Sequence, residues 1–308
     1  MGESTSGTRA GLRQQSQLAL LVRTMRPKQW TKNVFVWAAL IFDVKLFEPY
    51  WFLRTLGAFV LFCLISSAVY IINDLVDVPK DRLHPAKRNR PLASGALSTR
   101  TALVAAIVLI VGSLPAALAI GVPLTLILYG YLFLMVAYTF HLKHIVIVDV
   151  LTIALGFVMR VGAGVAVVDA ARFSPWLYVC MVLLALFLGL GKRRQELVLM
   201  NENSANTRKI LAEYNLRFVD EMLSLVSAST VMAYATYTFS APNLPENHLM
   251  MLTIPFVLYG IFRYLYLIHV KGETDPPDVV VLKDRPLQLA VLLFGAIVFV
   301  IFYLLPRS

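Results

Sequence analysis

Long apolar runs, separated by short polar segments, fill most of the chain. A helix that crosses a bilayer needs roughly 20 mostly apolar residues, and runs near that length recur throughout the sequence. The first run is the weakest, because Asp43 and Lys45 interrupt it. The pattern predicts an all-α, polytopic membrane protein in which residues 1–308 form one domain. We predict nine transmembrane helices, at 30–47, 51–73, 101–120, 122–140, 145–168, 174–191, 217–240, 249–268 and 287–305.

Basic residues gather on one side of this arrangement. The N-terminal segment, the loops at 74–100, 192–217 and 269–286, and Lys143 together hold 22 lysines and arginines, whereas the other side holds four. Lysine and arginine collect on the cytoplasmic side of membrane proteins. We therefore predict a plasma-membrane protein with cytoplasmic long loops, in which residues 1–29 form a cytoplasmic tail and interfacial segment.

Composition supports the membrane class. Hydrophobic residues make up 58% of the 308 residues and charged residues 15%, whereas soluble domains are about 45–50% apolar and about 25% charged. The net charge of +10 would suggest a nucleic-acid partner in a soluble protein, but its one-sided distribution explains it here, and we predict no such partner. Cys63 and Cys180 lie in separate apolar runs, without metal-ligand spacing.

Three aspartates follow the second run, in the stretch IINDLVDVPKDRLHPAKRNRPLASG at 71–95. Asp74, Asp77 and Asp81 stand at i, i+3 and i+7, positions that share one face of a helix. Pro79 is expected to break or restart the helix, which would make that face approximate. Carboxylates this close repel one another unless a cation binds them, and hard oxygen ligands suit Mg²⁺. The spacing therefore predicts a Mg²⁺ site at the membrane boundary.

Three basic residues, Lys87, Arg88 and Arg90, follow the aspartates. Such side chains bind phosphate oxygens, and arginine can bind two at once. The stretch therefore predicts that the metal ion is shared with a diphosphate. The alternative is a solvated loop in which opposite charges neutralise one another.

The segment NDLVDVPKD fits the motif N-D-x-x-D-x-x-x-D of the UbiA-type intramembrane prenyltransferase superfamily. RPLASG, MRPKQWTKN and the layout of nine runs also resemble that family, so the resemblance covers essentially the whole chain. It implies a ring of nine helices around a cavity open to the lipid. It also implies that Asn73, Asp74, Asp77 and Asp81 bind Mg²⁺ and a diphosphate.

The chain departs from that family at the usual second acidic motif, a D-x-x-x-D after the sixth span. LGKRRQELVLMNEN stands there, so that Lys192, Arg193 and Arg194 replace the expected acids and Glu196 is the nearest carboxylate. A basic site cannot hold a second Mg²⁺ in that way, but it can bind a phosphate directly, so the substrate should carry a further phosphate. GKRxxEL, YTFHLKH and MRVGAGVA are similar to the decaprenyl-phosphate phosphoribosyltransferase branch of the family.

That branch transfers 5-phosphoribose from phosphoribosyl diphosphate (PRPP) to a polyprenyl phosphate, and in actinobacteria its product leads to cell-wall arabinan. The resemblance implies Mg²⁺ as the cofactor, acting as a Lewis acid on the leaving diphosphate, and implies PRPP and a polyprenyl phosphate lipid as substrates. The 5-phosphate would bind either Lys87, Arg88 and Arg90, or Lys192 and Arg193. The acceptor phosphate is already anionic, so it needs no strong general base.

Further binding residues are expected elsewhere. Asp149 and Arg160 stand about three turns apart on one helical face; Arg160 would bind the lipid phosphate, unless the two form an internal pair. Lys192 and Glu196, at i and i+4, would bind substrate unless they pair with each other. Before the first span, Lys28, Gln29, Lys32 and Asn33 could reach the phosphates, although the two lysines could instead be interfacial anchors. By family position, Tyr138 and Lys143 would line the pocket.

Two other functions stay open. A UbiA-type prenyltransferase would move a prenyl group from a prenyl diphosphate to an aromatic or other polar acceptor, although GKRRQE argues against it. A transporter would not explain the aspartate motif, and no inverted repeat is evident. Assembly into a homo-oligomer is left open. Under the favoured interpretation, Asp74→Ala and Asp77→Ala should abolish turnover without unfolding the protein, because both would lie at a solvated boundary.

Overall fold

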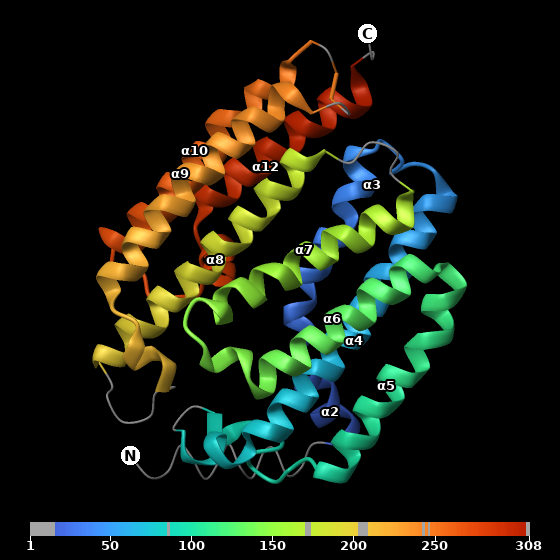
Figure 1. Ribbon diagram of the computed structural model, residues 1–308, viewed down its shortest axis with the longest axis vertical. Helices are drawn as coiled ribbons and strands as arrows, with labels where there is room; N and C mark the ends of the chain where they lie inside the picture. Colours follow the sequence, from blue (N-terminus) through green and yellow to red (C-terminus); the bar gives the residue numbers. More distant parts are fainter. Residues whose placement is uncertain are drawn as a thin grey trace. The chain divides into compact units, whose positions relative to one another are not determined.

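Helices make up the described chain (Figure 1), and this confirms the predicted all-α class. The computed structural model describes residues 16–84, 87–169, 174–202, 209–241, 244–245 and 247–305. The chain divides into two compact units. The first unit comprises Met1–Ala38, Glu48–Lys143 and Met159–Asp169, and the second unit comprises Ala39–Phe47, His144–Val158 and Ala170–Ser308.

Helix α4 is the centre of the first unit, since it packs against α2, η1, α5 and α6. Phe62 and Ile65 of α4 and Leu128 and Tyr131 of α6 belong to one buried apolar cluster. Serine side chains cap two helices here: Ser16 accepts from the N–H of Ala19, and Ser98 from that of Thr101. The unit is built from α2 (Gln17–Met25), the 3₁₀ helix η1 (Pro27–Trp37), α4 (Pro49–Leu83), η2 (Lys87–Asn89), α5 (Thr99–Ile120), α6 (Val122–Phe140), η3 (Leu142–His144) and the end of α7 (Val148–Val168).

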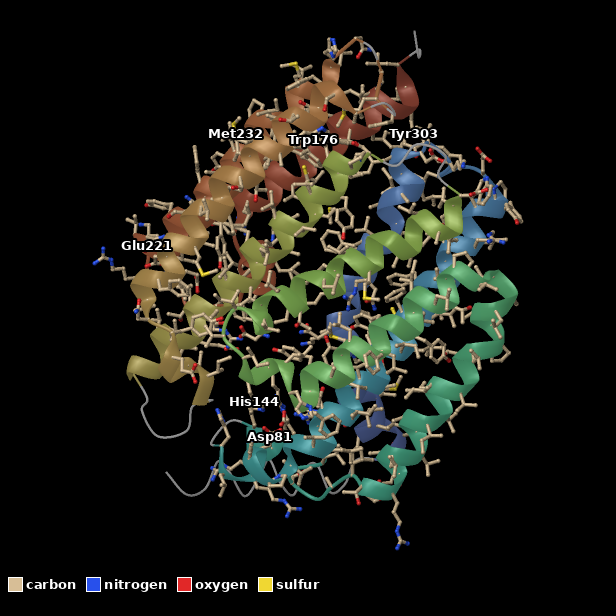
Figure 2. The ribbon with its side chains drawn as sticks, in the orientation of Figure 1. Asp81, His144, Trp176, Glu221, Met232 and Tyr303 are labelled. Carbon is tan, nitrogen blue, oxygen red and sulfur yellow. The ribbon has the colours of Figure 1, made fainter. Side chains whose placement is uncertain are left out.

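The second unit is a bundle in which α9 packs against α8 and α10, and α10 against α12 (Figure 1). The hydroxyl of Tyr303, labelled in Figure 2, donates to the carbonyl of Ile41 at 3.0 Å and so ties η6 to α3. Besides the start of α7, the unit comprises α3 (Ala38–Phe42), α8 (Pro175–Glu202), η4 (Lys209–Glu213), α9 (Leu216–Ser240), η5 (Leu249–Thr253), α10 (Ile254–His269), α11 (Pro277–Lys283), α12 (Arg285–Phe299) and the π-helical η6 (Val300–Leu304).

Seven helices of the described chain are long and apolar enough to cross a membrane, so the predicted nine spans stay a prediction. The run at 217–240 does form a helix, α9, but it is not one of the seven. The run at 30–47 forms η1 and then the short α3. A 3₁₀ helix has three residues per turn, and η1 accordingly buries Asn33 and Val36 on one side.

The expectation that Pro79 breaks α4 is wrong. The helix continues from Pro49 to Leu83 with Pro79 inside it. Proline removes one backbone hydrogen bond, but long-range contacts hold this end of the helix: Arg82 donates to the carbonyl of Ala93 at 3.2 Å, and Asp81 accepts from Arg90. Tertiary packing thus outweighs the local cost, and the face of the aspartates is continuous.

An arginine of the apolar helix α10 in the second unit is matched by a carboxylate. Arg263 of α10 donates to both oxygens of Asp284, at 3.2 and 2.9 Å. Asp284 also caps α12 by accepting from the N–H of Leu287 at 2.9 Å. This pairing assigns Arg263 to the packing of α10 against α12.

Candidate functional site

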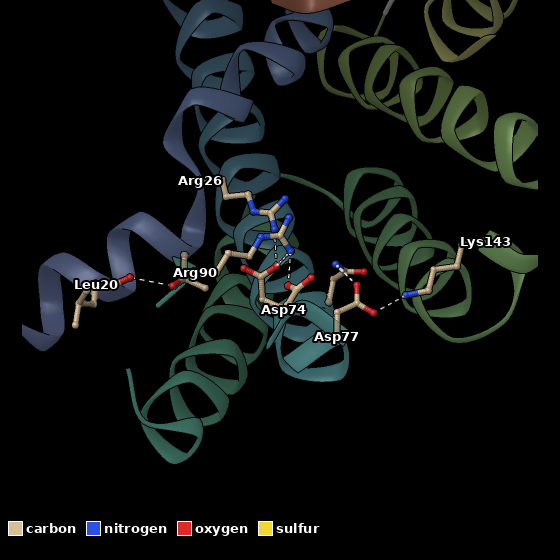
Figure 3. Close-up of polar contacts among 9 residues, drawn as sticks. Leu20, Arg26, Asp74, Asp77, Arg90 and Lys143 are labelled. Carbon is tan, nitrogen blue, oxygen red and sulfur yellow. Dashed lines mark hydrogen bonds and ion pairs between the residues drawn. The ribbon is translucent and has the colours of Figure 1, made fainter. Parts of the chain in front are cut away.

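The last turns of α4 carry the three aspartates of the predicted metal site. Figure 3 shows Asp74 and Asp77 projecting from this part of the helix. Asp74 and Asp81 are buried, with 3% and 4% of their surfaces exposed. A carboxylate removed from water to this extent needs hydrogen-bonding or cationic partners. The partners of these aspartates therefore define the chemistry of the site.

Two arginines satisfy the buried aspartates. Arg90 donates from Nη1 to Oδ1 of Asp74 at 3.2 Å and to Oδ2 of Asp81 at 2.6 Å. Arg26 donates to the same oxygen of Asp74, and its guanidinium lies 5.0 Å from the centre of the Tyr70 ring. Arg26 has a φ of 56°, a conformation uncommon for residues other than glycine. Sequence reasoning missed Arg26, although it stands within the segment MRPKQWTKN.

Asp77 is held by two other residues. Its Oδ1 accepts from Nζ of Lys143 at 3.0 Å, and its Oδ2 accepts from Nδ2 of Asn73 at 3.1 Å (Figure 3). Lys143 is 5% exposed and comes from η3, 66 residues further along the chain. The structure therefore brings the predicted site residues Asn73, Asp77 and Lys143 together.

The residue types on this face fit Mg²⁺, because carboxylate and amide oxygens are the hard ligands that this ion takes. Asn73, Asp74, Asp77 and Asp81 would hold it. Within the described ranges, no three Asp, Glu, His or Cys side chains converge as a metal site. The cationic groups from other parts of the unit hold the carboxylates instead, so binding a metal ion would require an exchange of partners.

The 3₁₀ turn η2 holds Lys87 and Arg88 just after α4. The backbone N–H of Lys87 donates to Nδ1 of His84 at 3.4 Å. Burial lowers the pKa of His84, and the charge of Lys87 lowers it further, so the ring is neutral at pH 7. Nε of Arg88 is buried without a hydrogen-bond partner among the described atoms. Arg90, the third basic residue predicted to bind phosphate, binds Asp74 and Asp81, and phosphate binding by all three residues stays a prediction.

A second polar cluster lies deeper in the first unit, around Arg160 of α7. Its Nε donates to Oδ1 of Asn33 at 2.8 Å and its Nη2 to the hydroxyl of Tyr131 at 2.9 Å. The Arg160 guanidinium also lies 4.7 Å from the centre of the Tyr131 ring. Asn33 in turn donates to Sγ of Cys63 and Oγ of Ser66, each at 3.3 Å. Asn33 and Arg160, which are 127 residues apart in sequence, therefore belong to one buried hydrogen-bonded cluster.

The second unit holds a third cluster, where α7 begins and α8 approaches its end. Arg193 donates from Nη2 to Asp149 and from Nη1 to Glu196. Asp149 and Arg193 are 0% and 3% exposed. Glu196 therefore pairs with Arg193, at i and i+3, and substrate binding by Lys192 and Glu196 stays a prediction. Arg194 lies apart from this cluster and donates to Asp220 of α9 at 2.7 Å.

Tyr214 completes the third cluster, and sequence reasoning missed it. Its hydroxyl donates to Oδ1 of Asp149 at 2.8 Å and accepts from the backbone N–H of Ile147 at 2.7 Å. Burial raises the pKa of Tyr214 to about 12, so the hydroxyl keeps its proton at neutral pH. No motif in the sequence points to a tyrosine 65 residues from Asp149.

The remaining predicted site residues lie on helices of the first unit. Lys28 is exposed, and Gln29, Lys32 and Tyr138 are partly buried. The backbone N–H of Gln29 donates to the carbonyl of Arg26 at 2.8 Å, which fixes the start of η1 beside the aspartate site. The substrate contacts of all four stay predictions.

Comparison with known proteins gives a consistent result. The UbiA prenyltransferase family matches residues 34–282. A protein of Mycobacterium tuberculosis (strain H37Rv) named decaprenyl-phosphate phosphoribosyltransferase is 34% identical over 285 residues, which are 91% of this chain and 93% of the relative. A Corynebacterium glutamicum protein of the same name is 32% identical over 93% of this chain and 87% of its own length.

Solved structures show the same fold. The structure of a UbiA homolog from Archaeoglobus fulgidus bound to GPP and Mg²⁺ has a TM-score of 0.69 and 21% identity, covering 92% of this chain and 99% of that one. A UbiA homolog from Aeropyrum pernix has a TM-score of 0.63 and 17% identity, covering 89% of this chain and 98% of that one.

Proposed function

The chain belongs to the UbiA prenyltransferase family, and on this premise we propose that it is a polyprenyl-phosphate phosphoribosyltransferase. It would transfer 5-phosphoribose from PRPP to a decaprenyl-like phosphate and release diphosphate. One observation carries the proposal: the relatives named decaprenyl-phosphate phosphoribosyltransferase match about nine-tenths of the chain at about one-third identity. The basic segment GKRRQEL, where the family usually has acids, supports a substrate with a further phosphate.

The aspartate face of α4 suits the leaving diphosphate. When bound there, Mg²⁺ would supply a Lewis acid for the charge that develops on the diphosphate. Arg26, Arg90 and Lys143 already lie at the aspartates. With Mg²⁺ bound to the carboxylates, these three side chains would bind phosphate oxygens, and arginine can bind two of them at once.

The reaction breaks one bond and makes one bond at the anomeric carbon of the ribose. The bond from C1 to the diphosphate oxygen breaks with its electron pair going to the diphosphate. An anionic oxygen of the lipid phosphate forms the new bond to C1 from the opposite side, which inverts that centre. No proton has to move, so the residues of the site contribute positioning and electrostatic stabilisation.

The setting of the enzyme is part of the proposal. We place the protein in the plasma membrane with the aspartate face at the cytoplasmic boundary, because PRPP is water-soluble and the basic loops favour that side. Residues 1–308 would act as one domain, with assembly of several copies left open.

A transfer assay tests the proposal. Purified protein receives PRPP labelled in the ribose, decaprenyl phosphate and Mg²⁺, and we expect labelled lipid that carries phosphoribose. A parallel reaction with a labelled prenyl diphosphate and an aromatic acid tests the alternative prenyl transfer. Labelled lipid in the second reaction, with none in the first, would overturn the proposal. A matched reaction with Asp77→Asn protein controls for contaminating activity.

A further inference from the structure

We propose that Tyr214 is a positioning residue for donor binding, acting through Asp149 and Arg193 on the segment of α8 that carries Lys192. This inference rests on the proposed function, and it takes Lys192 as a ligand of the 5-phosphate of PRPP, which is one of the two alternatives that the sequence left open. It differs from the sequence-based expectation in one respect. Arg193 is an internal anchor here, and phosphate binding at this end of α8 falls to Lys192.

The contacts of Tyr214 form a continuous chain into α8. The hydroxyl accepts from the N–H of Ile147 at 2.7 Å and donates to Oδ1 of Asp149 at 2.8 Å. The second oxygen of Asp149 accepts from Arg193, which also binds Glu196. Tyr214, Asp149 and Arg193 are each at most 5% exposed. Among the described atoms Nε of Arg193 is buried without a hydrogen-bond partner, so the orientation of this side chain is fixed by its two Nη groups, which bind Glu196 and Asp149.

Burial explains why Arg193 is unsuited to be the phosphate ligand. Transferring its guanidinium to a phosphate would leave the fully buried Asp149 without its cation, and an unpaired buried charge is costly. Arg193 and the two carboxylates that it binds also carry a net negative charge together. A phosphate approaching this cluster therefore needs another cation, and Lys192 is the adjacent one in sequence.

Helix geometry connects the anchor to Lys192. Successive residues of an α-helix are separated by about 100° around its axis. When Arg193 is held inward by Asp149, the direction of Lys192 is therefore set as well. Lys192 is exposed whereas Arg193 is buried, as this geometry requires. The network thus acts on Lys192 through the backbone of α8.

A strained turn shows that the network is under constraint. Ile147 has a φ of 68°, which is an outlier for a β-branched residue. Its N–H is held by Tyr214, and its carbonyl accepts from the N–H groups of Val150 and Leu151 at 3.1 and 3.0 Å. Strained conformations persist where their surroundings determine them, and they cluster at functional sites. Tyr214 therefore holds the turn that aims Asp149 at Arg193.

The first test compares a tyrosine of the Asp149–Arg193 network with a buried tyrosine outside it. Tyr214→Phe removes both hydrogen bonds of the hydroxyl, and Tyr234→Phe removes the 2.6 Å bond between the buried Tyr234 hydroxyl and Thr253 elsewhere in the second unit. We expect Tyr214→Phe to raise the KM for PRPP and the Kd of PRPP with Mg²⁺ about tenfold. The KM for the lipid phosphate should stay constant. Tyr234→Phe should change neither constant, even if it lowers Tm equally.

A double-mutant cycle tests whether Tyr214 acts through Arg193. Arg193→Lys keeps the charge but cannot bind Asp149 and Glu196 through two separate guanidinium nitrogens as arginine does. This variant should therefore also raise the KM for PRPP. The double variant should be no worse than Arg193→Lys alone, because both changes break the same chain of contacts. Effects that multiply would overturn the inference, as would a PRPP affinity of Tyr214→Phe equal to that of the wild type.

A second variant keeps the inference testable if Tyr214→Phe does not fold. If Tyr214→Phe yields no folded protein, Ile147→Gly is combined with it, because glycine adopts a positive φ without strain. We expect folded protein with weakened PRPP binding, and unchanged PRPP binding would overturn the inference. Wild-type protein that transfers nothing from PRPP would instead overturn the proposed function, so the two failures are distinguishable.

Discussion

Nη1 of Arg90 lies 2.6 Å from Oδ2 of Asp81, and the same nitrogen lies 3.2 Å from Asp74. One guanidinium nitrogen thus bridges two buried carboxylates that stand seven residues, or about two turns, apart on α4. This cation holds the oxygens that a metal ion would need. The aspartate site is therefore self-neutralised without a metal, and its partners must change for Mg²⁺ and diphosphate to bind.

We predict that Arg90→Gln changes metal and donor binding in opposite directions. Mn²⁺ alone should bind about tenfold more tightly, because a cationic competitor is gone, and PRPP with Mg²⁺ should bind about tenfold more weakly, because a charged donor is lost. Electron paramagnetic resonance of Mn²⁺ and calorimetry with PRPP measure the two affinities. Arg82→Gln makes the same charge change beside the site and should alter neither. If the affinities for Mn²⁺ and for PRPP both fell, Arg90 would not be competing with the metal ion for the carboxylates.

Asp74→Ala and Asp77→Ala should both abolish turnover but should differ in stability. The expectation that both lie at a solvated boundary is wrong for Asp74, which is 3% exposed. Removing its carboxylate leaves Arg26 and Arg90 short of an acceptor and should cost about 2 kcal/mol, less than for a fully buried pair. The side chain of Asp77 is 15% exposed, so Asp77→Ala should lower the free energy of unfolding by less than Asp74→Ala. Thermal unfolding in detergent gives both values, and equal Tm losses would refute the distinction.

Tyr131→Phe should destabilise the protein by about 1.5–3 kcal/mol, because the Tyr131 hydroxyl accepts from the charged Arg160. Tyr129→Phe is the matched change in α6, where the hydroxyl donates to the carbonyl of Ile110, and it should cost about 1 kcal/mol. Unfolding measurements compare the two. The KM for the lipid phosphate, measured alongside, tests Arg160 as its ligand: a rise specific to Tyr131→Phe would support that role.

Gly191→Ala should destabilise the second unit by about 1–3 kcal/mol through overpacking. An added Cβ would collide with the hydroxyl of Tyr264 and lie 3.2 Å from Cγ of Pro277. Gly295 of α12 has nothing within 4 Å of the corresponding position, so Gly295→Ala should be neutral or gain up to about 1 kcal/mol from helix propensity. A Tm for Gly191→Ala equal to the wild-type value would show that Tyr264 moves aside at no cost.

The lowered pKa of His84 predicts a pH effect on stability. Burial and the charge of Lys87 disfavour the protonated ring in the folded state. The folded state therefore binds fewer protons than the unfolded state as pH falls below the ordinary value of about 6.5. The contribution of His84 is fully present above that value and is lost as pH falls through the lowered pKa. We expect Tm to fall between pH 7 and pH 5 by more in the wild type than in His84→Gln, and parallel curves would contradict this.

Much of the fold was predictable because its signals are local. The length of an apolar run and the 3.6-residue period depend on neighbouring residues, and these placed most helices and put Asp74, Asp77 and Asp81 on one face. The exceptions arose where tertiary contacts override local preference. Pro79 stays within α4, and the run at 30–47 contains most of a 3₁₀ helix and then a short α-helix, with Asn33 turned inward to Arg160.

The sequence by itself determined the membrane class, the family and the acidic face, since each depends on residue types at short spacing. Only the tertiary structure decided which basic side chain pairs with which carboxylate. Arg26 reaches Asp74 across 48 residues, and Tyr214 reaches Asp149 across 65. Such pairs form because buried charges and hydroxyls must find partners when helices pack, and no local pattern specifies which partner a packed helix will bring.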